Sequence, residues 1–447
     1  MTLQEQKFKQ MTEPPVHKLI CKLAIPCIIS MLVTSFYNMA DTYFVGMMDS
    51  TAATGAVGVV FAMMAIIQAV GFFFGHGSGN YISRMLGKQN HQEASVMAST
   101  GFFSALATGV LICVVGEFFL EPLAFLLGAT NAMLKDTKAY LGVILLGAPW
   151  MTASLVLNNQ LRYQGSAMYA MVGIVAGAVI NIGLDPLLIL YFDMGVAGAG
   201  WATIISQFIS FCILLIGCSK GGNLRLQFGA IRLKWIYFKN IIQGGLPSLA
   251  RQSLASVAAM CLNHVAGDLG DAAVIAAMTV VQRIMMFGGS AMIGFGQGFQ
   301  PFCGFNYGAR LYDRVKKGFW FCFKSSTGFL ALIALAGFIF APQLISVFRD
   351  DPDVIAIGAT ALRFQWVTFC FHGWIVMSSM MTQTIGLTGP ATFLAVARQG
   401  LFFIPLVWIL SSAFGLPGIQ MTQAAADLLT LVVSIPIQIT AMRHMTD

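Results

Sequence analysis

Two aspartates lie inside long apolar stretches of the sequence. Asp41 lies in the run NMADTYF, and Asp185 lies in NIGLDPL, four residues after Asn181. In the middle of a lipid bilayer an ionised Asp costs roughly 2.5–3.5 kcal/mol on insertion scales, and a counter-charge, a bound cation or a proton must offset that cost. The two aspartates are therefore candidates for a cation or proton site.

Polar oxygen groups accompany each aspartate at helical spacing. Asn181 and Asp185 are four residues apart, as are Tyr37 and Asp41, which places each pair on one face of a helix. Thr203 adds a hydroxyl in the next apolar run. Carboxylate, amide and hydroxyl oxygens are hard ligands that suit a small cation such as Na⁺, and neighbouring carboxyl groups can also pass a proton. The alternative is that each Asp caps or pairs locally beside a water-filled cavity.

The apolar stretches of the second half carry mainly cationic residues. These are Arg251, Arg283, Arg363 and Arg398, with Asp427 as the one acid. Arg251 or Arg398 could form a structural ion pair with Asp427, and the alternative is contact with an anionic or polar substrate. Methionines in this half could give a flexible, polarisable lining. Candidate substrate contacts are Tyr37, Gln282, Arg283, Met285, Arg251 and Arg398.

The other residues that could do chemistry are isolated. The nine cysteines include no CxxC pair, and His76, His264 and His372 lack the spacing of metal ligands. The glycine-rich runs at 75–80 and 294–301 lack the Lys-Ser/Thr ending and the preceding strand of a phosphate-binding loop. The cysteines and histidines therefore predict no disulfide framework or metal site, and we expect no cofactor apart from a transported Na⁺ or H⁺. Without a nucleotide motif, we expect an ion gradient to supply the energy.

The composition places these residues in a membrane. Of 447 residues, 57% are hydrophobic and only 10% are charged, whereas soluble proteins carry about 25% charged residues. This excludes a water-soluble fold and intrinsic disorder. A helical span needs roughly 20 apolar residues, so we expect an all-α polytopic membrane protein. Apolar runs predict twelve transmembrane helices, near 18–46, 52–86, 94–117, 133–157, 167–191, 195–218, 240–267, 272–308, 316–340, 353–385, 390–413 and 416–442.

The distribution of Lys and Arg between the loops predicts the orientation. Basic residues, Arg162 among them, gather in the segments on the side of the N-terminus, and none is expected deep within the first six spans. The opposite loops hold only Lys135, Lys138 and Arg349. We therefore expect a multi-pass protein of the cell membrane with both termini in the cytoplasm. The net charge of +7 follows from this topology, and no basic domain suggests a nucleic-acid partner.

The chain contains an internal repeat. The shift that superposes Pro26 on Pro247 continues without a gap until Gly87 falls on Gly308, and it places Asp41 on Leu262. An even number of spans per copy gives both copies the same orientation, related by a pseudo-two-fold axis along the membrane normal, which is typical of secondary transporters. We expect an N-terminal lobe at 1–218, a cytoplasmic connector at 219–239 and a C-terminal lobe at 240–447.

Specific motifs accompany this doubled plan of six spans. Pro26 and Pro247 begin the two copies, an NxxD occurs at 38–41, and an NxxxDP occurs at 181–186. Together these features resemble the multidrug and toxic compound extrusion (MATE) family over nearly the whole chain. Among its branches the sequence looks like the DinF type, whose cation site lies in the N-terminal lobe. The other main branch places an acid on span seven, where this sequence has Arg251 and no Asp or Glu.

The resemblance implies an antiporter, coupled to H⁺ or Na⁺, that exports structurally varied and often cationic or amphipathic drugs by alternating access. Pro26 would be the bend point of the first span. The expected partners are a small-molecule drug and membrane lipid, and the expected state is a monomer. The residues implied for the cation site are Asp41, Asn181, Asp185 and Thr203, with Tyr140 and Asn158 in the surrounding hydrogen-bond network.

Three other functions make different demands on the sequence. A flippase or exporter of an anionic lipid-linked or metabolite substrate would line one cavity with Arg251, Arg283, Arg363 and Arg398. An intramembrane enzyme, such as an acyl or prenyl transferase, would need clustered His or several Asp in one motif, and neither occurs. We therefore expect no enzyme. A channel is less natural for a two-lobed repeat.

Overall fold

A computed structural model describes residues 2–47, 51–268 and 272–445 of the chain, which are helical apart from short connections. The side chains of seven residues within helices lie outside this description: Asp41, Thr42, Val45, Gly46, Thr51, Thr54 and Ala272. No strand occurs in the described ranges. Helices are the expected solution, because a bilayer offers no hydrogen-bond partners to the backbone.

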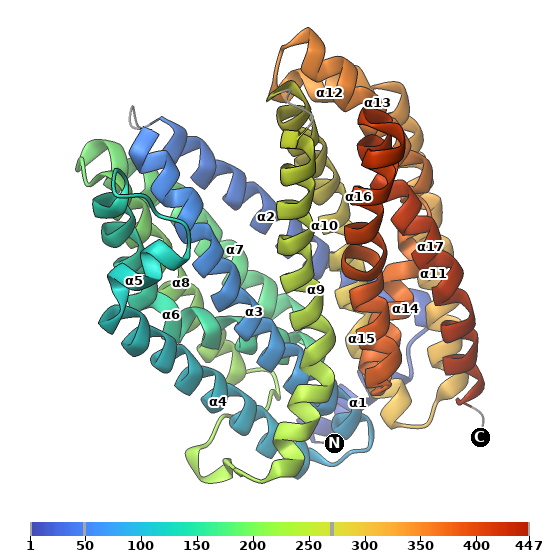
Figure 1. The fold of residues 1–447 in the computed structure, drawn as a ribbon. Coiled ribbons are helices and arrows are strands. Elements are labelled where there is room, and N and C mark those ends of the chain that lie inside the picture. The colour runs from blue at the N-terminus through green and yellow to red at the C-terminus, as the bar shows by residue number, and fades with distance from the viewer. Residues whose placement is uncertain (1, 48–50, 269–271, 446–447) are drawn as a thin grey trace.

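The first half of the chain forms one bundle (Figure 1). A short helix α1 precedes the long α2, which runs through Pro26 without interruption. A π-helix, η1, follows directly on α7. The elements are α1 (Leu3–Thr12), α2 (Val16–Gly46), α3 (Thr51–Gly87), α4 (His91–Phe118), α5 (Leu120–Leu126), α6 (Leu134–Tyr163), α7 (Ala167–Pro186), η1 (Leu187–Tyr191) and α8 (Gly195–Cys218).

The second half forms the other bundle (Figure 1). Its fourth span is a bent pair, α13 and α14, with an angle of 56° between the two helices. The elements are η2 (Phe228–Ala230), α9 (Trp235–Asp268), α10 (Ala272–Gly308), α11 (Tyr312–Ile339), α12 (Ala341–Phe348), α13 (Pro352–Phe369), α14 (His372–Ile385), α15 (Thr388–Val396), η3 (Ala397–Phe402), α16 (Phe403–Phe414) and α17 (Leu416–Arg443).

The helix boundaries repeat with the spacing seen in the sequence. The shift that carries Pro26 onto Pro247 also carries both ends of α3 onto those of α10, and both ends of α4 onto those of α11. By length and hydropathy, ten helices in the described residues could each cross a membrane, and the bent pair adds an eleventh span. Helix α9 has 34 residues but falls outside this group. It carries the polar Arg251 and Gln252 near its middle. When α9 is counted as a further span, the layout matches the expected twelve spans.

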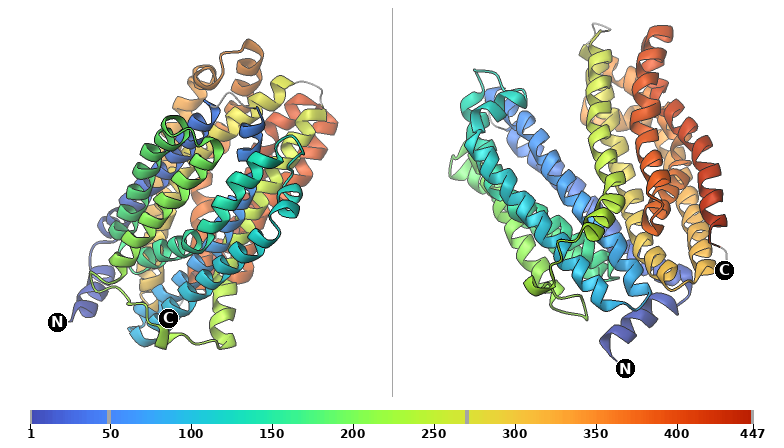
Figure 2. Two further views of the ribbon diagram at one scale, coloured as in Figure 1. Left: turned by 90° about the vertical axis from the view of Figure 1, so that its left-hand side faces the viewer. Right: turned by 60° about the horizontal axis from the view of Figure 1, so that its bottom comes forward.

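The two bundles meet through two equivalent helix pairs, α2 with α10 and α9 with α3. Glycines allow the close approach. A Cβ added at Gly298 of α10 would lie 2.3 Å from the Cα of Ala24, and one added at Gly77 of α3 would lie 2.3 Å from the carbonyl oxygen of Ile241. From these contacts the bundles diverge toward the end that carries α12 (Figures 1 and 2). We call the opposite end, which holds α1, residues 219–234 and the last turn of α17, the basic end.

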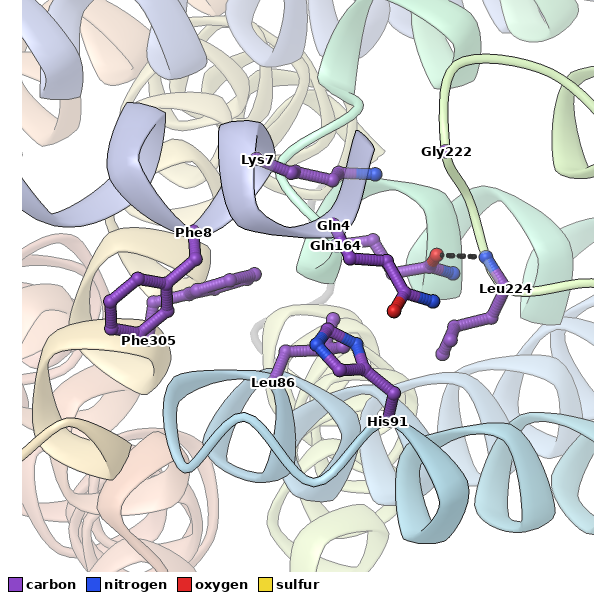
Figure 3. A pocket seen from close by; sticks show the side chains of 9 residues that line it. All are labelled: Gln4, Lys7, Phe8, Leu86, His91, Gln164, Gly222, Leu224 and Phe305. Atoms are coloured by element: carbon purple, nitrogen blue, oxygen red, sulfur yellow. Dashed lines mark hydrogen bonds between the residues drawn. The ribbon is translucent and has the colours of Figure 1, made fainter. Parts of the chain in front are cut away.

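Helix α1 packs across the basic end and joins both halves (Figure 3). The ammonium group of Lys7 donates hydrogen bonds to Ser166 of the first half and to Asn223 of the segment that follows α8. On the other side, Asn306 of α10 donates to the carbonyl oxygen of Met11 across 3.1 Å. The N-terminal segment therefore bridges the two bundles where they are closest.

Candidate functional site

A partly enclosed cavity lies within the first bundle, between α2, α3, α6, α7 and α8. Its volume is about 90 Å³, which is room for a few water molecules or a small hydrated ion. Apolar side chains form part of its wall. The polar residues that line it are Thr34, Tyr37, Gln68, Ser154, Asn158, Asn181, Thr203, Ser206, Gln207 and Ser210.

Asn181 is the most unusual group in this cavity. Its side chain is only 1% exposed, and neither its amide nitrogen nor its amide oxygen has a hydrogen-bond partner among the described residues. Buried amides are nearly always hydrogen-bonded, because an unsatisfied polar group costs about 1–3 kcal/mol. An amide left in this state at a cavity wall indicates a place for a polar ligand, an ion or water.

Asp185 lies one helical turn beyond Asn181 on α7 and is fully buried, with 0% exposure. The next residue, Pro186, has no N–H, and the π-helix η1 begins at Leu187. Proline and the wider π-turn both disrupt the regular hydrogen-bond ladder, and such interruptions are frequent at functional sites. The sequence-predicted pair Asn181 and Asp185 is therefore buried on one helix, at the point where that helix changes its geometry.

Helix α8 presents a polar face to the cavity. Thr203, Ser206, Gln207 and Ser210 recur at intervals of three and four residues, which places them on one side of a helix. The hydroxyls of Thr203 and Ser206 donate to the carbonyl oxygens of the preceding turn, at 3.0 and 2.6 Å. Their oxygen lone pairs can still accept a hydrogen bond or contact a cation.

The two network residues expected from the resemblance have different positions. Asn158 lines the cavity and donates to the carbonyl oxygen of Ala170 across 3.0 Å. Tyr140 is fully buried on the same helix, and its hydroxyl is 3.8 Å from the sulfur of Met64. It is not part of the cavity wall.

Asp41 lies on α2, but its side chain falls outside the described part of the structure. Its neighbour one turn earlier, Tyr37, lines the cavity and is 9% exposed. The structure therefore brings together Tyr37, Asn158, Asn181 and Thr203 around one cavity, with Asp185 buried one turn away. The expected pairing of the two aspartates stays a prediction.

Gln68, Ser154, Ser206, Gln207 and Ser210 also line the cavity, although the sequence analysis does not single them out. The signal that could have found the α8 residues is the periodicity of polar side chains within an otherwise apolar run. Ser154 precedes Asn158 by four residues on α6, so the same spacing could have found it, whereas Gln68 is flanked by apolar residues on both sides and no local pattern marks it.

The arginines of the second half do not gather in one cavity. Arg398 pairs with Asp427, with 2.7 Å between Nε and Oδ1. Arg251 is 3.4 Å from the amide oxygen of Gln383, and Arg363 donates to a backbone carbonyl oxygen at the end of α11. Arg283 is exposed, and its neighbours Gln282 and Met285 on α10 are half-buried. This dispersal does not favour the flippase arrangement, in which the four arginines share one cavity.

One expectation about charge is wrong. The sequence predicts that the fourth span ends near residue 157 and that Arg162 lies in the loop after it. Helix α6 instead continues to Tyr163, and Arg162 is only 4% exposed. The two terminal nitrogens of its guanidinium group contact Gln297, His76 and Asn159, and these neutral partners allow the helix to continue past the expected boundary.

The donors at the cavity are amide and hydroxyl oxygens, with a carboxylate nearby. Among the described side chains, no three or more His, Cys, Asp and Glu residues gather in a metal-binding group. Oxygen donors of this kind suit protons and hard cations rather than transition metals.

A sequence profile described as MatE matches the chain twice, at residues 26–187 and 247–409. The chain belongs to the MatE family. The two matches begin at Pro26 and Pro247, which are also the residues that begin the two copies of the repeat. The chain is therefore a membrane transporter of the MATE multidrug-efflux family, and it is not an enzyme.

Relatives and solved structures agree over nearly the whole length. The chain is 26% identical to the multidrug export protein MepA of Staphylococcus aureus strain MSSA476, over 93% of this chain and 92% of the relative. It is also 26% identical to MepA of Staphylococcus saprophyticus, over 95% and 94%. A structure described as the outward-facing conformation of a multidrug resistance MATE family transporter of the MOP superfamily superposes with a TM-score of 0.92, at 25% identity and 98% coverage of each chain.

Proposed function

We propose that this MATE transporter is a cation-coupled antiporter of the DinF type, which exports structurally varied, often cationic or amphipathic compounds in exchange for H⁺ or Na⁺. The observation that carries the proposal is the buried and unsatisfied amide of Asn181 at the cavity, one turn from the buried Asp185. The similarity to MepA, a multidrug export protein, supports export of small molecules.

The transported cation would occupy the first-half cavity. Asn181 supplies an amide oxygen with no other partner among the described residues, Thr203 supplies a hydroxyl, and Asp185 with Asp41 would supply negative charge. Asn158 and Tyr140 would hold the surrounding helices in place. A proton would neutralise a carboxylate directly, whereas Na⁺ would be held by the same oxygens, so both ions are compatible with this set.

Helix α2 is positioned to transmit occupancy of this site to the second half. Thr34 and Tyr37 face the cavity, whereas the neighbouring Ser35 forms a 2.7 Å hydrogen bond to Ser290 of α10. Pro26 lies in the same helix, and its missing N–H removes one intrahelical hydrogen bond. A bend at Pro26 would let cation binding in one half change the contact with the other.

Alternating access would then move the lobe 1–218 against the lobe 240–447, joined by the connector 219–239. With the basic end and both termini in the cytoplasm, the present arrangement is closed to the inside. A membrane potential of 100 mV supplies about 2.3 kcal/mol per charge, and a tenfold ion gradient supplies about 1.4 kcal/mol. Together they can sustain a gradient of a few hundred-fold for each ion when the substrate is uncharged, whereas a one-for-one exchange with a monovalent cation draws on the ion gradient alone.

Substrate would bind between the lobes. Candidate contacts remain Tyr37, Gln282, Arg283, Met285, Arg251 and Arg398. The side chains of Arg283 and Met286 on α10 are exposed and therefore accessible to a ligand. We propose that the transporter acts as a monomer within the lipid of the cell membrane.

The test is transport in proteoliposomes, with sodium and proton gradients imposed separately. We expect one of the two gradients to drive uptake of a fluorescent cation such as rhodamine 6G, and Asp41→Asn and Asp185→Asn each to abolish that uptake in folded protein. Asp193→Asn is the matched control, because Asp193 is exposed in the loop after η1. Full gradient-driven transport in both Asp41→Asn and Asp185→Asn would overturn the proposal.

A further inference from the structure

Three arginines lie between the two bundles near the basic end and have only neutral partners. Arg84 of α3 donates to the carbonyl oxygen of Thr384 across 2.7 Å, and Arg162 of α6 donates to Gln297 of α10 across 2.7 Å. Arg251 of α9 is 3.4 Å from Gln383 of α14. In the described part of the chain, none of the three is within 4.0 Å of a carboxylate oxygen. We call Arg84, Arg162 and Arg251 the inner arginine cluster.

The contacts of Arg84 and Arg162 cross from the first bundle to the second. They hold the interface closed, but a guanidinium group gains less from an amide or a carbonyl oxygen than from a carboxylate. A cation buried without a counter-charge is unfavourable in a low-dielectric interface. In the closed arrangement the arginines of the cluster therefore have no anionic partner and could bind an anion.

Other polar groups lie around the cluster, and several lack hydrogen-bond partners among the described residues. Asn80 is 0% exposed and has no partner for either amide atom, and Nδ1 of His76 and Nε of Arg162 are unsatisfied as well. The fully buried ring of Tyr163 has its centre 5.5 Å from the guanidinium carbon of Arg162. His76, Asn80 and Arg84 are four residues apart on α3, so they share one helix face.

We propose that the inner arginine cluster is a binding site for an oxyanion, a carboxylate or phosphate group carried by an amphipathic molecule. The inference rests on the proposed alternating access, because separating the bundles at the basic end would free Arg84 and Arg162 from their cross-bundle contacts, while Arg251 is held only by weak 3.4 Å contacts within its own bundle. The freed groups are hydrogen-bond donors: guanidinium forks, the amide of Asn80 and the hydroxyl of Tyr163. Arginine forks match the geometry of carboxylate and phosphate.

The oxyanion has two possible sources with the same chemistry, a transported anionic amphiphile and the head group of an anionic lipid. Both would enter from the basic end and meet the same donors. A cation such as rhodamine 6G would gain nothing from the cluster. The site therefore predicts a preference for anions at the basic end, separate from the cation cavity of the first bundle.

The test is equilibrium binding of carboxyfluorescein to the full-length protein in phosphatidylcholine nanodiscs, measured by fluorescence anisotropy. We expect carboxyfluorescein to bind at least tenfold more tightly than rhodamine 6G. Arg84→Gln and Arg251→Gln should each weaken carboxyfluorescein binding at least tenfold, and Arg84→Lys should retain part of it. Arg225→Gln removes an exposed charge at the same end and serves as the control, with unchanged binding.

A second series of nanodiscs containing phosphatidylglycerol distinguishes the sources. If phosphatidylglycerol weakens carboxyfluorescein binding to wild type but not to Arg84→Gln, the lipid head group is a ligand of the cluster. If carboxyfluorescein binding to wild type is the same in both kinds of nanodisc, the ligand is the soluble anion. The inference is overturned if wild type binds the two dyes equally, or if both Gln variants bind carboxyfluorescein as wild type does. Gradient-driven rhodamine 6G transport by the same protein reports separately on the antiport proposal.

Discussion

Nε of Arg398 lies 2.7 Å from Oδ1 of Asp427, joining the π-helix η3 to α17. Gln423 donates to the same carboxylate oxygen across 2.9 Å. Both members of the pair are largely buried, with side-chain exposures of 24% for Arg398 and 6% for Asp427. Arg398 rather than Arg251 is thus the partner of Asp427, and the interaction ties the wide turn of η3 to its neighbouring helix.

This ion pair predicts that a single substitution of either partner destabilises the fold more than the substitution of both partners together. Asp427→Asn or Arg398→Leu leaves one buried charge without its partner, which should destabilise the fold by about 3–5 kcal/mol. The double variant Arg398→Leu with Asp427→Leu should recover much of that loss. Thermal denaturation in detergent measures both effects. Glu121→Gln breaks the exposed pair with Lys138 and should cost less than about 1 kcal/mol. Equal losses for the buried and exposed pairs would contradict the prediction.

The helices and their repeat were largely predictable, because the bilayer restricts the backbone to one solution. Apolar length marks the spans, and the offset between the two sequence copies reappears in the bounds of α3 and α10. The i, i+4 spacing of Asn181 and Asp185 also predicted a shared buried face, because it depends only on helix geometry.

Contacts between distant helices were not predictable in the same way. The choice between Arg251 and Arg398 as the partner of Asp427 depends on the π-helix η3, which no local signal marked. The charge of Arg162 predicts a loop because it masks the continuation of α6, and its burial depends on contacts to His76 and Gln297 of other helices. Single polar residues such as Gln68 join the cavity through packing alone.

The unsatisfied amide of Asn181 predicts that stability and coupling respond in opposite directions. Asn181→Leu has a similar volume and removes a buried polar group without a partner among the described residues, so it should leave the thermal midpoint unchanged or raise it. The same change should abolish gradient-driven transport, because a ligand oxygen is lost. Asn240→Leu is a comparison, because Asn240 is bonded only to its own helix at the basic end. Loss of stability in Asn181→Leu would show that the amide has a structural partner.

Docking of α1 should depend on pH through Lys7. Burial lowers the pKa of Lys7 to about 8, from an ordinary value of 10.5. Lys7 therefore holds its proton less tightly when α1 is docked than when α1 is undocked. Docking should be weakest below pH 8, where Lys7 is protonated in both states, and it should strengthen as the pH rises from about 8 toward 10.5. His91 lines the same pocket (Figure 3), but its ordinary pKa of about 6.5 lies below this window.

Hydrogen exchange of the α1 amides, corrected for intrinsic rates, measures this dependence. Protection should increase between pH 7.5 and 9.5 in wild type and should stay constant in Lys7→Gln, which keeps a donor but cannot titrate in this range. Lys9→Gln is the control, because Lys9 is exposed on the same helix. A pH dependence that survives in Lys7→Gln would assign the effect to another group.

Gly298 should control how closely the bundles approach at the basic end. A Cβ at this position would lie 2.3 Å from the backbone of Ala24, whereas one at Gly289 on the same helix would meet nothing within 4 Å. Gly298→Ala should therefore force α10 and α2 apart and favour opening at this end, while Gly289→Ala should not. The buried thiols of Cys27 and Cys303 report the change. Maleimide labelling should be faster in Gly298→Ala than in wild type, and equal rates in the two glycine variants would show that this contact does not hold the interface closed.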